Sequence, residues 1–230
     1  MNVNRLIFWD IDGTLMHCGS DGRKALNWTF FELYGITNAF NQVTIGGAMD
    51  SNLIVNIMKN FRIDRKDYHL IVKRYQKNLT DVLENNKKKR ILPGVVTLLD
   101  TIKQNSDSIN ALLTSNLKIG AEAKLRSVGL IDYFDMGGFG DELGEKWDAA
   151  ESCIQLAEDV YQTSFKKEHI FLIGDSCYDV FCAKKLGINS VAVATGWAEP
   201  KTLIDCKPSY YFSDLSDTDQ VLEALDIFEK

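Results

Sequence analysis

The chain has 230 residues, of which 45% are hydrophobic and 25% are charged, and its formal net charge is −6. This mixture is typical of a globular protein, and the acidic balance argues against the basic surface that binds nucleic acids or anionic membranes. We therefore expect neither a nucleic acid nor a membrane among its partners.

Four short apolar segments that end in small or polar residues are predicted to form buried strands. They span residues 5–10, 109–113, 169–173 and 190–194. Apolar residues recur at helical spacing around these segments, which predicts helices within residues 95–102, 150–161, 176–186 and 221–228, the last of them including Phe228. Strands that alternate with helices of this length predict an α/β fold, a Rossmann-like parallel sheet with helices on both faces.

Residues 17–88 break this alternation, because they contain no convincing strand. Three apolar stripes predict three helices instead, and the Gly46–Gly47 pair is expected to be a flexible linker before the second. An insertion after the first strand would overhang the carboxyl edge of the sheet, where ligands of open α/β sheets bind. The predicted organisation is an α/β core, residues 1–16 and 89–230, with an all-α cap domain, residues 17–88.

Pairs of carboxylates follow two of the predicted strands. Asp10 and Asp12 lie two residues apart at the end of the first strand, where a period of two places both side chains on one side. Asp175 and Asp179 follow the third strand and start a helix. Because parallel strands end at the same edge of a sheet, these acids should converge, and oxygen-only ligands favour Mg²⁺.

The same edge offers other groups that phosphoryl transfer needs. A carboxylate nucleophile accepts the phosphoryl group, a second acid moves protons, and hydroxyl and N–H donors hold the phosphoryl oxygens. Thr114, after the second strand, supplies such a hydroxyl. Taken alone, Asp-Gly after a strand is often a turn, and Asp175 is also a reasonable helix cap. Their joint occurrence at neighbouring strand ends favours a site.

Three segments carry a resemblance to a known family. Residues 8–15 (FWDIDGTL), 112–116 (LLTSN) and 173–179 (IGDSCYD) resemble the first, second and fourth motifs of the haloacid dehalogenase-like hydrolases. The chain is similar over essentially its whole length to the phosphatase branch that carries a helical cap after the first motif, which includes phosphoglycolate phosphatases.

The resemblance implies catalytic and phosphate-binding roles for five residues. Asp10 would be the nucleophile, and Asp12 the general acid and base. Thr114 would hold the transferring phosphoryl group, with Ser115 and Asn116 beside it.

A metal site follows from the same resemblance. Asp10, Asp12 (through its backbone carbonyl) and Asp175 would bind Mg²⁺, and Asp179 would support the site from outside the ligand set or through water.

The lysine of the third motif is harder to place. Many relatives have it in a Lys-Pro pattern before the helix that precedes the fourth motif, whereas this chain has Lys146 followed by a tryptophan. Lys146 is the best-placed candidate to hold the crowded negative charge, and Lys118 is the alternative.

These assignments predict a Mg²⁺-dependent phosphatase that hydrolyses a small phosphorylated metabolite, similar to phosphoglycolate, through an aspartyl-phosphate intermediate. A sugar phosphomutase of the same superfamily and a phosphoacceptor signalling module are the alternatives. Arg23 is predicted to bind the substrate from the cap. Relatives often carry an arginine just before the position of Asp50, where this chain has Ala48 and Met49, so the identity of the substrate stays open.

The cysteines bear on the compartment. Five of them are scattered along the chain without a CxxC pair, which argues against a disulfide framework and a zinc site. The first apolar run, residues 6–9, is too short for a signal peptide or a membrane span. We expect a cytoplasmic monomer or homodimer.

Overall fold

The computed structural model describes residues 3–41, 43 and 48–227. Gly46–Gly47 and Phe228, which the sequence places in a linker and in the last helix, lie outside this range.

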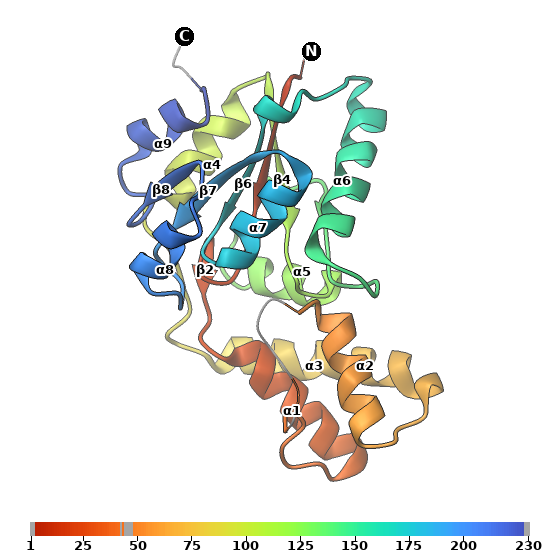
Figure 1. The fold of residues 1–230 in the computed structure, drawn as a ribbon. Coiled ribbons are helices and arrows are strands. Elements are labelled where there is room, and N and C mark those ends of the chain that lie inside the picture. The colour runs from red at the N-terminus through yellow and green to blue at the C-terminus, as the bar shows by residue number, and fades with distance from the viewer. Residues whose placement is uncertain (1–2, 42, 44–47, 228–230) are drawn as a thin grey trace.

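A parallel sheet forms the centre of the molecule, and its strands follow the order β5-β4-β1-β6-β7-β8 (Figure 1). The strand bounds are Arg5–Trp9 (β1), Ser108–Leu113 (β4), Gly137–Gly138 (β5), Ile170–Gly174 (β6), Asn189–Val193 (β7) and Tyr210–Phe212 (β8). The four predicted strands are β1, β4, β6 and β7, and the predicted α/β sheet is confirmed.

Helices cover both faces of this sheet, because alternate residues of its buried strands point to opposite sides. Leu6 and Phe8 of β1 pack with α6 and α7, whereas Ile7 and Trp9 share a core with α4, α5 and α9. The helix bounds in this part are Val95–Gln104 (α4), Lys118–Arg126 (α5), Lys146–Tyr161 (α6), Cys177–Leu186 (α7), Pro200–Asp205 (α8) and Thr218–Ala224 (α9).

The helical insertion consists of α1 (Asp21–Tyr34), α2 (Asp50–Asn60) and α3 (Tyr68–Asn85), which lie together beyond one end of the sheet (Figure 1). Helices α1 and α3 pack against each other, and the three predicted helices are present. The split into folding units of residues 1–16 with 89–230 and 17–88 stays a prediction.

Backbone hydrogen bonds attach the helical insertion to the rest of the chain at two places, and α3 also packs against α5. The first is a short antiparallel ribbon, β2 (Met16–His17) with β3 (Arg90–Ile91), through which both connecting segments pass. The second is the start of α2, where the backbone N–H groups of Asp50 and Ser51 donate to the carbonyls of Ser115 and Gly140 at 2.8 and 3.0 Å.

The strand order places a crevice at the end of β1. The chain passes from β1 to β4 and β5 on one side, and then returns to β6, β7 and β8 on the other side. Ligands of open α/β sheets bind where the strand order reverses in this way, beyond the carboxyl ends. Asp10, Thr114 and Asp175 each follow directly after one of the three central strands.

The cysteine prediction is wrong on one point, because Cys177 and Cys206 form a disulfide with their Cα atoms 6.0 Å apart. The residues are 29 positions apart, and only the packing of the start of α7 beside the end of α8 brings them together. Cys18, Cys153 and Cys182 are free and buried. Within the described ranges, no helix is both long and apolar enough to cross a bilayer.

Candidate active site at the carboxyl edge of the sheet

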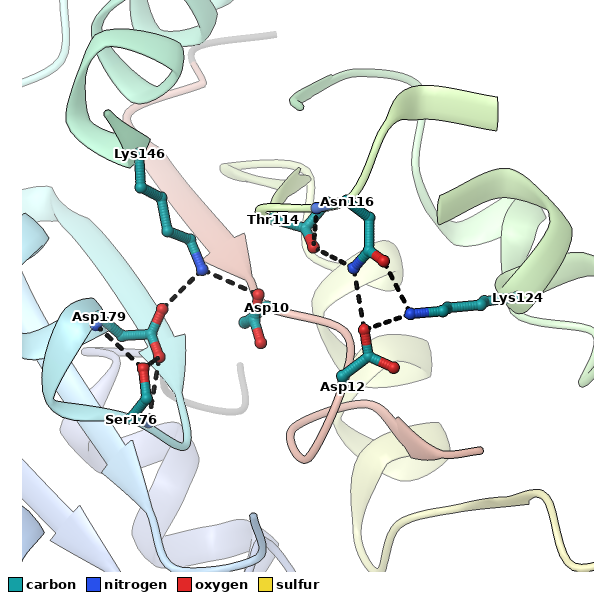
Figure 2. A network of polar contacts seen from close by, with 8 residues as sticks. All are labelled: Asp10, Asp12, Thr114, Asn116, Lys124, Lys146, Ser176 and Asp179. Carbon is teal, nitrogen blue, oxygen red and sulfur yellow. Dashed lines mark hydrogen bonds and ion pairs between the residues drawn. The ribbon is translucent and has the colours of Figure 1, made fainter. Parts of the chain in front are cut away.

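A buried lysine links two carboxylates beyond the end of β1. The ammonium of Lys146 lies 2.8 Å from Asp10 Oδ1 and 2.6 Å from Asp179 Oδ1 (Figure 2). All three residues are at least nine-tenths buried. Burial disfavours the charged ammonium, but the two carboxylates outweigh that effect and raise the pKa of Lys146. Lys146 is therefore a fixed positive charge against Asp10.

Local structure fixes each of these side chains. Asp10 continues β1, and its backbone N–H donates to the carbonyl of Ile173 on β6 at 2.9 Å. Lys146 is the first residue of α6. Asp179 Oδ2 accepts from the backbone N–H and the hydroxyl of Ser176, which caps α7 and leaves Oδ1 for Lys146. The start of each helix thus points a charged group at the end of β1.

Asp175 lies in a space that only glycine neighbours allow. A Cβ on Gly196 would lie 1.5 Å from Asp175 Oδ2, and one on Gly13 would lie 2.4 Å from it. Gly13 also has a φ of 91°, which a residue with a side chain rarely adopts. The glycine of the Asp-Gly-Thr sequence therefore serves both the turn after β1 and the close approach of Asp175.

Three carboxylates form a cluster that suits a divalent cation. Asp10, Asp175 and Asp179 each place an oxygen within 4.8 Å of the other two. Burial, opposed by Lys146, raises the pKa of Asp10 to about 6. Burial together with the charges of Asp10 and Asp179 raises the pKa of Asp175 to about 8. One lysine among three acids leaves negative charge that a hard, oxygen-binding ion such as Mg²⁺ would offset.

Asp12 has hydrogen-bond partners of its own, although it lies close enough to Asp10 for its charge to help raise the pKa of Asp10. Its Oδ2 accepts from Lys124 at 2.5 Å and from Asn116 Nδ2 at 2.9 Å (Figure 2). That Asp10 and Asp12 point to one side of the strand end stays a prediction. The predicted role of Asp12 as a metal ligand was through its carbonyl, and this role stays a prediction.

Lys124 is a site residue that the sequence analysis missed. It lies on α5, is 4% exposed, and also donates to Asn116 Oδ1 at 2.7 Å. Burial alone would raise the pKa of Asp12, but the charge of Lys124 and the hydrogen bonds lower it overall. Asp12 is consequently held as a carboxylate. A lysine within a short polar helix carries no sequence signal that separates it from surface lysines.

The segment after β4 positions donors near both networks. Thr114 is fully buried, and its hydroxyl accepts from the backbone N–H of Asn116 at 3.2 Å and from Asn116 Nδ2 at 2.7 Å. Asn116 thereby connects Thr114 with Asp12. Ser115 lines the adjacent cavity, and its carbonyl holds the start of α2.

Lys118 and Arg23 are the predicted site residues still to be placed. Lys118 is exposed, and its ammonium stacks on the ring of Phe139 at 5.8 Å, away from Asp10. Lys146, the preferred candidate, is the lysine that contacts Asp10. Arg23 lies on α1 with its guanidinium 5.1 Å from the ring centre of Phe40, and both residues line the same cavity as Asp12.

That cavity has a volume of about 540 Å³ and lies between the helical insertion and the ends of the strands. Its wall includes Asp12, Ser115 and Lys124 on one side and Arg23 and Tyr75 on the other. A compound bound with its phosphate near Asp10 would extend into this space past Asp12.

Asp50, at the start of α2, also lines the cavity and gives a test of its electrostatics. Burial, opposed by Lys124 and by a 3.1 Å hydrogen bond from the backbone N–H of Leu117, raises its pKa to about 6, and Asp12 and Asp141 add to the rise. Because the pKa of Asp50 is higher in the folded than in the unfolded state, its contribution to the free energy of unfolding is greatest at low pH and is lost as the pH rises through 6.

The stability of Asp50→Asn relative to wild type should therefore increase as the pH rises. The amide keeps an oxygen that accepts from the N–H of Leu117, and it carries no charge to desolvate. We expect its free energy of unfolding, relative to wild type, to increase by about 1 kcal/mol between pH 5 and pH 8. Urea unfolding of both proteins at the two pH values measures this difference. A difference that stays constant or falls would contradict the buried-charge explanation.

Comparison with known proteins agrees with the three sequence motifs. The profile of the haloacid dehalogenase-like hydrolase family matches residues 7–193. Phosphoglycolate phosphatase of Synechococcus elongatus is 26% identical over 155 residues, which are 67% of this chain and 68% of that protein. Phosphoglycolate phosphatase of Chromobacterium violaceum is also 26% identical, over 138 residues, 60% of this chain and 58% of that protein.

The fold is shared with solved structures of low sequence identity. CbbY from Rhodobacter sphaeroides, in complex with phosphate, has a TM-score of 0.68 at 17% identity, covering 94% of this chain and 96% of its own. A hydrolase from Pseudomonas syringae has a TM-score of 0.69 at 16% identity, covering 96% and 99%. Since the family profile spans β1 to β7 and includes all three motifs, the chain belongs to the haloacid dehalogenase-like hydrolases.

Proposed function

We propose that this protein is a Mg²⁺-dependent phosphatase that hydrolyses a small phosphomonoester through an aspartyl-phosphate intermediate. The observation that carries the proposal is the position of Asp10, whose carboxylate lies at the sheet edge against Lys146 and within the Asp175–Asp179 cluster. Two relatives are named phosphoglycolate phosphatases, so phosphoglycolate is the first substrate to test.

Asp10 and Asp175, with the carbonyl of Asp12, would hold the Mg²⁺ ion, and Asp179 would orient it from beside the ligands. When bound, the ion neutralises charge on the phosphoryl oxygens and on the cluster. Lys146 adds a second positive charge, which the short contacts to Asp10 and Asp179 keep in place.

In the first step, a carboxylate oxygen of Asp10 forms a bond to phosphorus while the bond from phosphorus to the ester oxygen breaks. Thr114 and the N–H groups after β4 bind the phosphoryl oxygens, and Lys146 offsets their charge. The leaving alkoxide takes a proton from Asp12. Because Lys124 holds Asp12 as a carboxylate in the free enzyme, Asp12 must first take up that proton from water, which the negative charge of the bound phosphate favours.

In the second step, water attacks the phosphorus of the aspartyl phosphate and releases Asp10. Asp12 removes the proton of that water as the new oxygen–phosphorus bond forms. Lys124 and Asn116 favour the ionised carboxylate of Asp12, which is the form that a general base requires.

The helical insertion would act as a cap that covers the cavity and excludes water. Arg23 would bind an anionic or polar part of the leaving group from the side of the helical insertion. A cytoplasmic location and a monomeric or homodimeric state belong to the same proposal, and the Cys177–Cys206 disulfide counts against the cytoplasmic location, because such bonds are rare in reducing compartments.

The test is the release of inorganic phosphate from a panel of small phosphate esters with Mg²⁺. We expect many equivalents of phosphate per protein for at least one ester. A single equivalent of labelling, as in a phosphoacceptor signalling module, or isomerisation of a sugar phosphate without release, as in a phosphomutase, would contradict the proposal.

A further inference from the structure

Two buried donors in the wall of the cavity have hydrogen-bonding capacity that no described residue uses. One is the ammonium of Lys124 on α5, and the other is the hydroxyl of Tyr75 on α3. Both donors line the cavity, so a bound ligand with an oxygen acceptor can take the place of water beside them.

The ammonium of Lys124 has three N–H groups, and its neighbours in the described part of the chain accept two of them. Asp12 Oδ2 accepts one at 2.5 Å, and Asn116 Oδ1 accepts another at 2.7 Å. The residue is 4% exposed and lines the cavity, so the third N–H is available to a group bound there.

Tyr75 is 3% exposed, and its hydroxyl makes no hydrogen bond with any residue that the structure describes. Two glycines lie beside this hydroxyl, and Gly120 is the closer of the two. A Cβ on Gly120 would lie 3.3 Å from Tyr75 Oη, and one on Gly22 would lie 3.6 Å from Oη and 3.7 Å from Lys124 Nζ. Tyr75 Oη and Lys124 Nζ therefore converge beside Gly22.

Gly120 and Lys124 are four residues apart on α5 and so lie on the same face of that helix. Glycine within a helix lowers its stability. Here it leaves room for the Tyr75 hydroxyl next to the lysine, so α3 and α5 together place two hydrogen-bond donors in a wall that also includes Leu26 and Leu53.

We propose that Tyr75 and Lys124 form a subsite that donates hydrogen bonds to an oxygen acceptor on the leaving group. The inference rests on the proposed function, in which Asp12 contacts the ester oxygen. Lys124 lies within hydrogen-bond distance of Asp12, so the acceptor it reaches is close to the ester oxygen, on the neighbouring carbon atom. The substrate class is a phosphomonoester with a carboxylate or a hydroxyl at that position.

Equilibrium binding separates this subsite from the chemistry. Asp10→Asn, which is not expected to turn over, is titrated by calorimetry in the presence of Mg²⁺ with three esters: phosphoglycolate, which carries a carboxylate, glycerol 3-phosphate, which carries a hydroxyl, and ethyl phosphate, which carries no such acceptor. The same titrations use Asp10→Asn combined with Tyr75→Phe, and Asp10→Asn combined with the control Tyr133→Phe, whose exposed hydroxyl bonds to Asp100 instead.

Of phosphoglycolate and glycerol 3-phosphate, the subsite should favour one, which will have the lower Kd. We expect Tyr75→Phe to raise the Kd of that ester and to change the Kd of ethyl phosphate less than twofold. The rise should be about threefold to tenfold if the acceptor is a hydroxyl and more than tenfold if it is a carboxylate. Tyr133→Phe should change none of the three.

Equal effects on all esters, or no effect of Tyr75→Phe, would overturn the subsite, as would tighter binding of ethyl phosphate than of both other esters. If the wild-type enzyme releases phosphate but Tyr75→Phe changes no Kd, the subsite is refuted and the proposed function stands. Binding as expected without wild-type turnover would leave the subsite and overturn the proposed chemistry.

Discussion

Asp10→Asn is expected to lower kcat by about 10⁴-fold or more, because an amide neither attacks phosphorus effectively nor carries the charge that the cluster supplies. The fold should survive, since the backbone N–H of Asp10 keeps its bond to Ile173 and Lys146 keeps Asp179 as a partner. The measurement is steady-state phosphate release, with circular dichroism and thermal melting as checks on folding.

The control for this variant is Asp132→Asn, at an exposed position away from the sheet edge, which should keep wild-type kcat. Rapid acid quenching of the wild-type enzyme with labelled substrate should also trap a phosphoprotein that Asp10→Asn does not form. A folded Asp10→Asn enzyme with kcat within tenfold of wild type would show that another residue is the nucleophile.

Removing divalent metal is expected to abolish turnover as completely as Asp10→Asn does. Without a cation, Asp10, Asp175 and Asp179 repel both one another and the incoming phosphate, and Lys146 offsets only one of the charges. Excess EDTA should reduce phosphate release to background, and added Mg²⁺ should restore it. Ca²⁺ should inhibit, because its larger and more flexible coordination shell misplaces the nucleophile.

A second measurement tests the metal site without turnover. Mg²⁺ should raise the melting temperature of the wild-type protein in a concentration-dependent way, because it binds only the folded cluster. The increase should be much smaller in Asp175→Asn. Full activity in EDTA after dialysis, or an equal stabilisation of wild type and Asp175→Asn, would contradict the site.

Most of the sheet could be predicted from sequence, because strands buried on both faces are continuous apolar runs. The two edge strands could not. Gly137–Gly138 has no apolar pattern and pairs with β4 through its backbone, and Tyr210–Phe212 is a short, partly exposed edge. Their pairing depends on neighbours that are distant in sequence.

The features of the site also divide into those that the sequence could predict and those that it could not. Asp10, Asp175 and Asp179 could be brought together from strand ends alone, because a parallel sheet collects those ends on one edge. Lys124 and the Cys177–Cys206 bond could not, since each depends on how two helices pack. The ion pair of Asp12 was also out of reach, because Lys124 comes to it from α5.

The two attachments of the helical insertion have a consequence for how substrate enters. The β2–β3 ribbon would be the axis of an opening rotation, and the N–H groups of Asp50 and Ser51 bond α2 to the carbonyls of Ser115 and Gly140. Opening the cavity by rotation about the ribbon must break those two hydrogen bonds. The amide hydrogens of Asp50 and Ser51 should then exchange with deuterium at the rate at which the enzyme opens, and a tightly bound phosphate ester should slow that exchange.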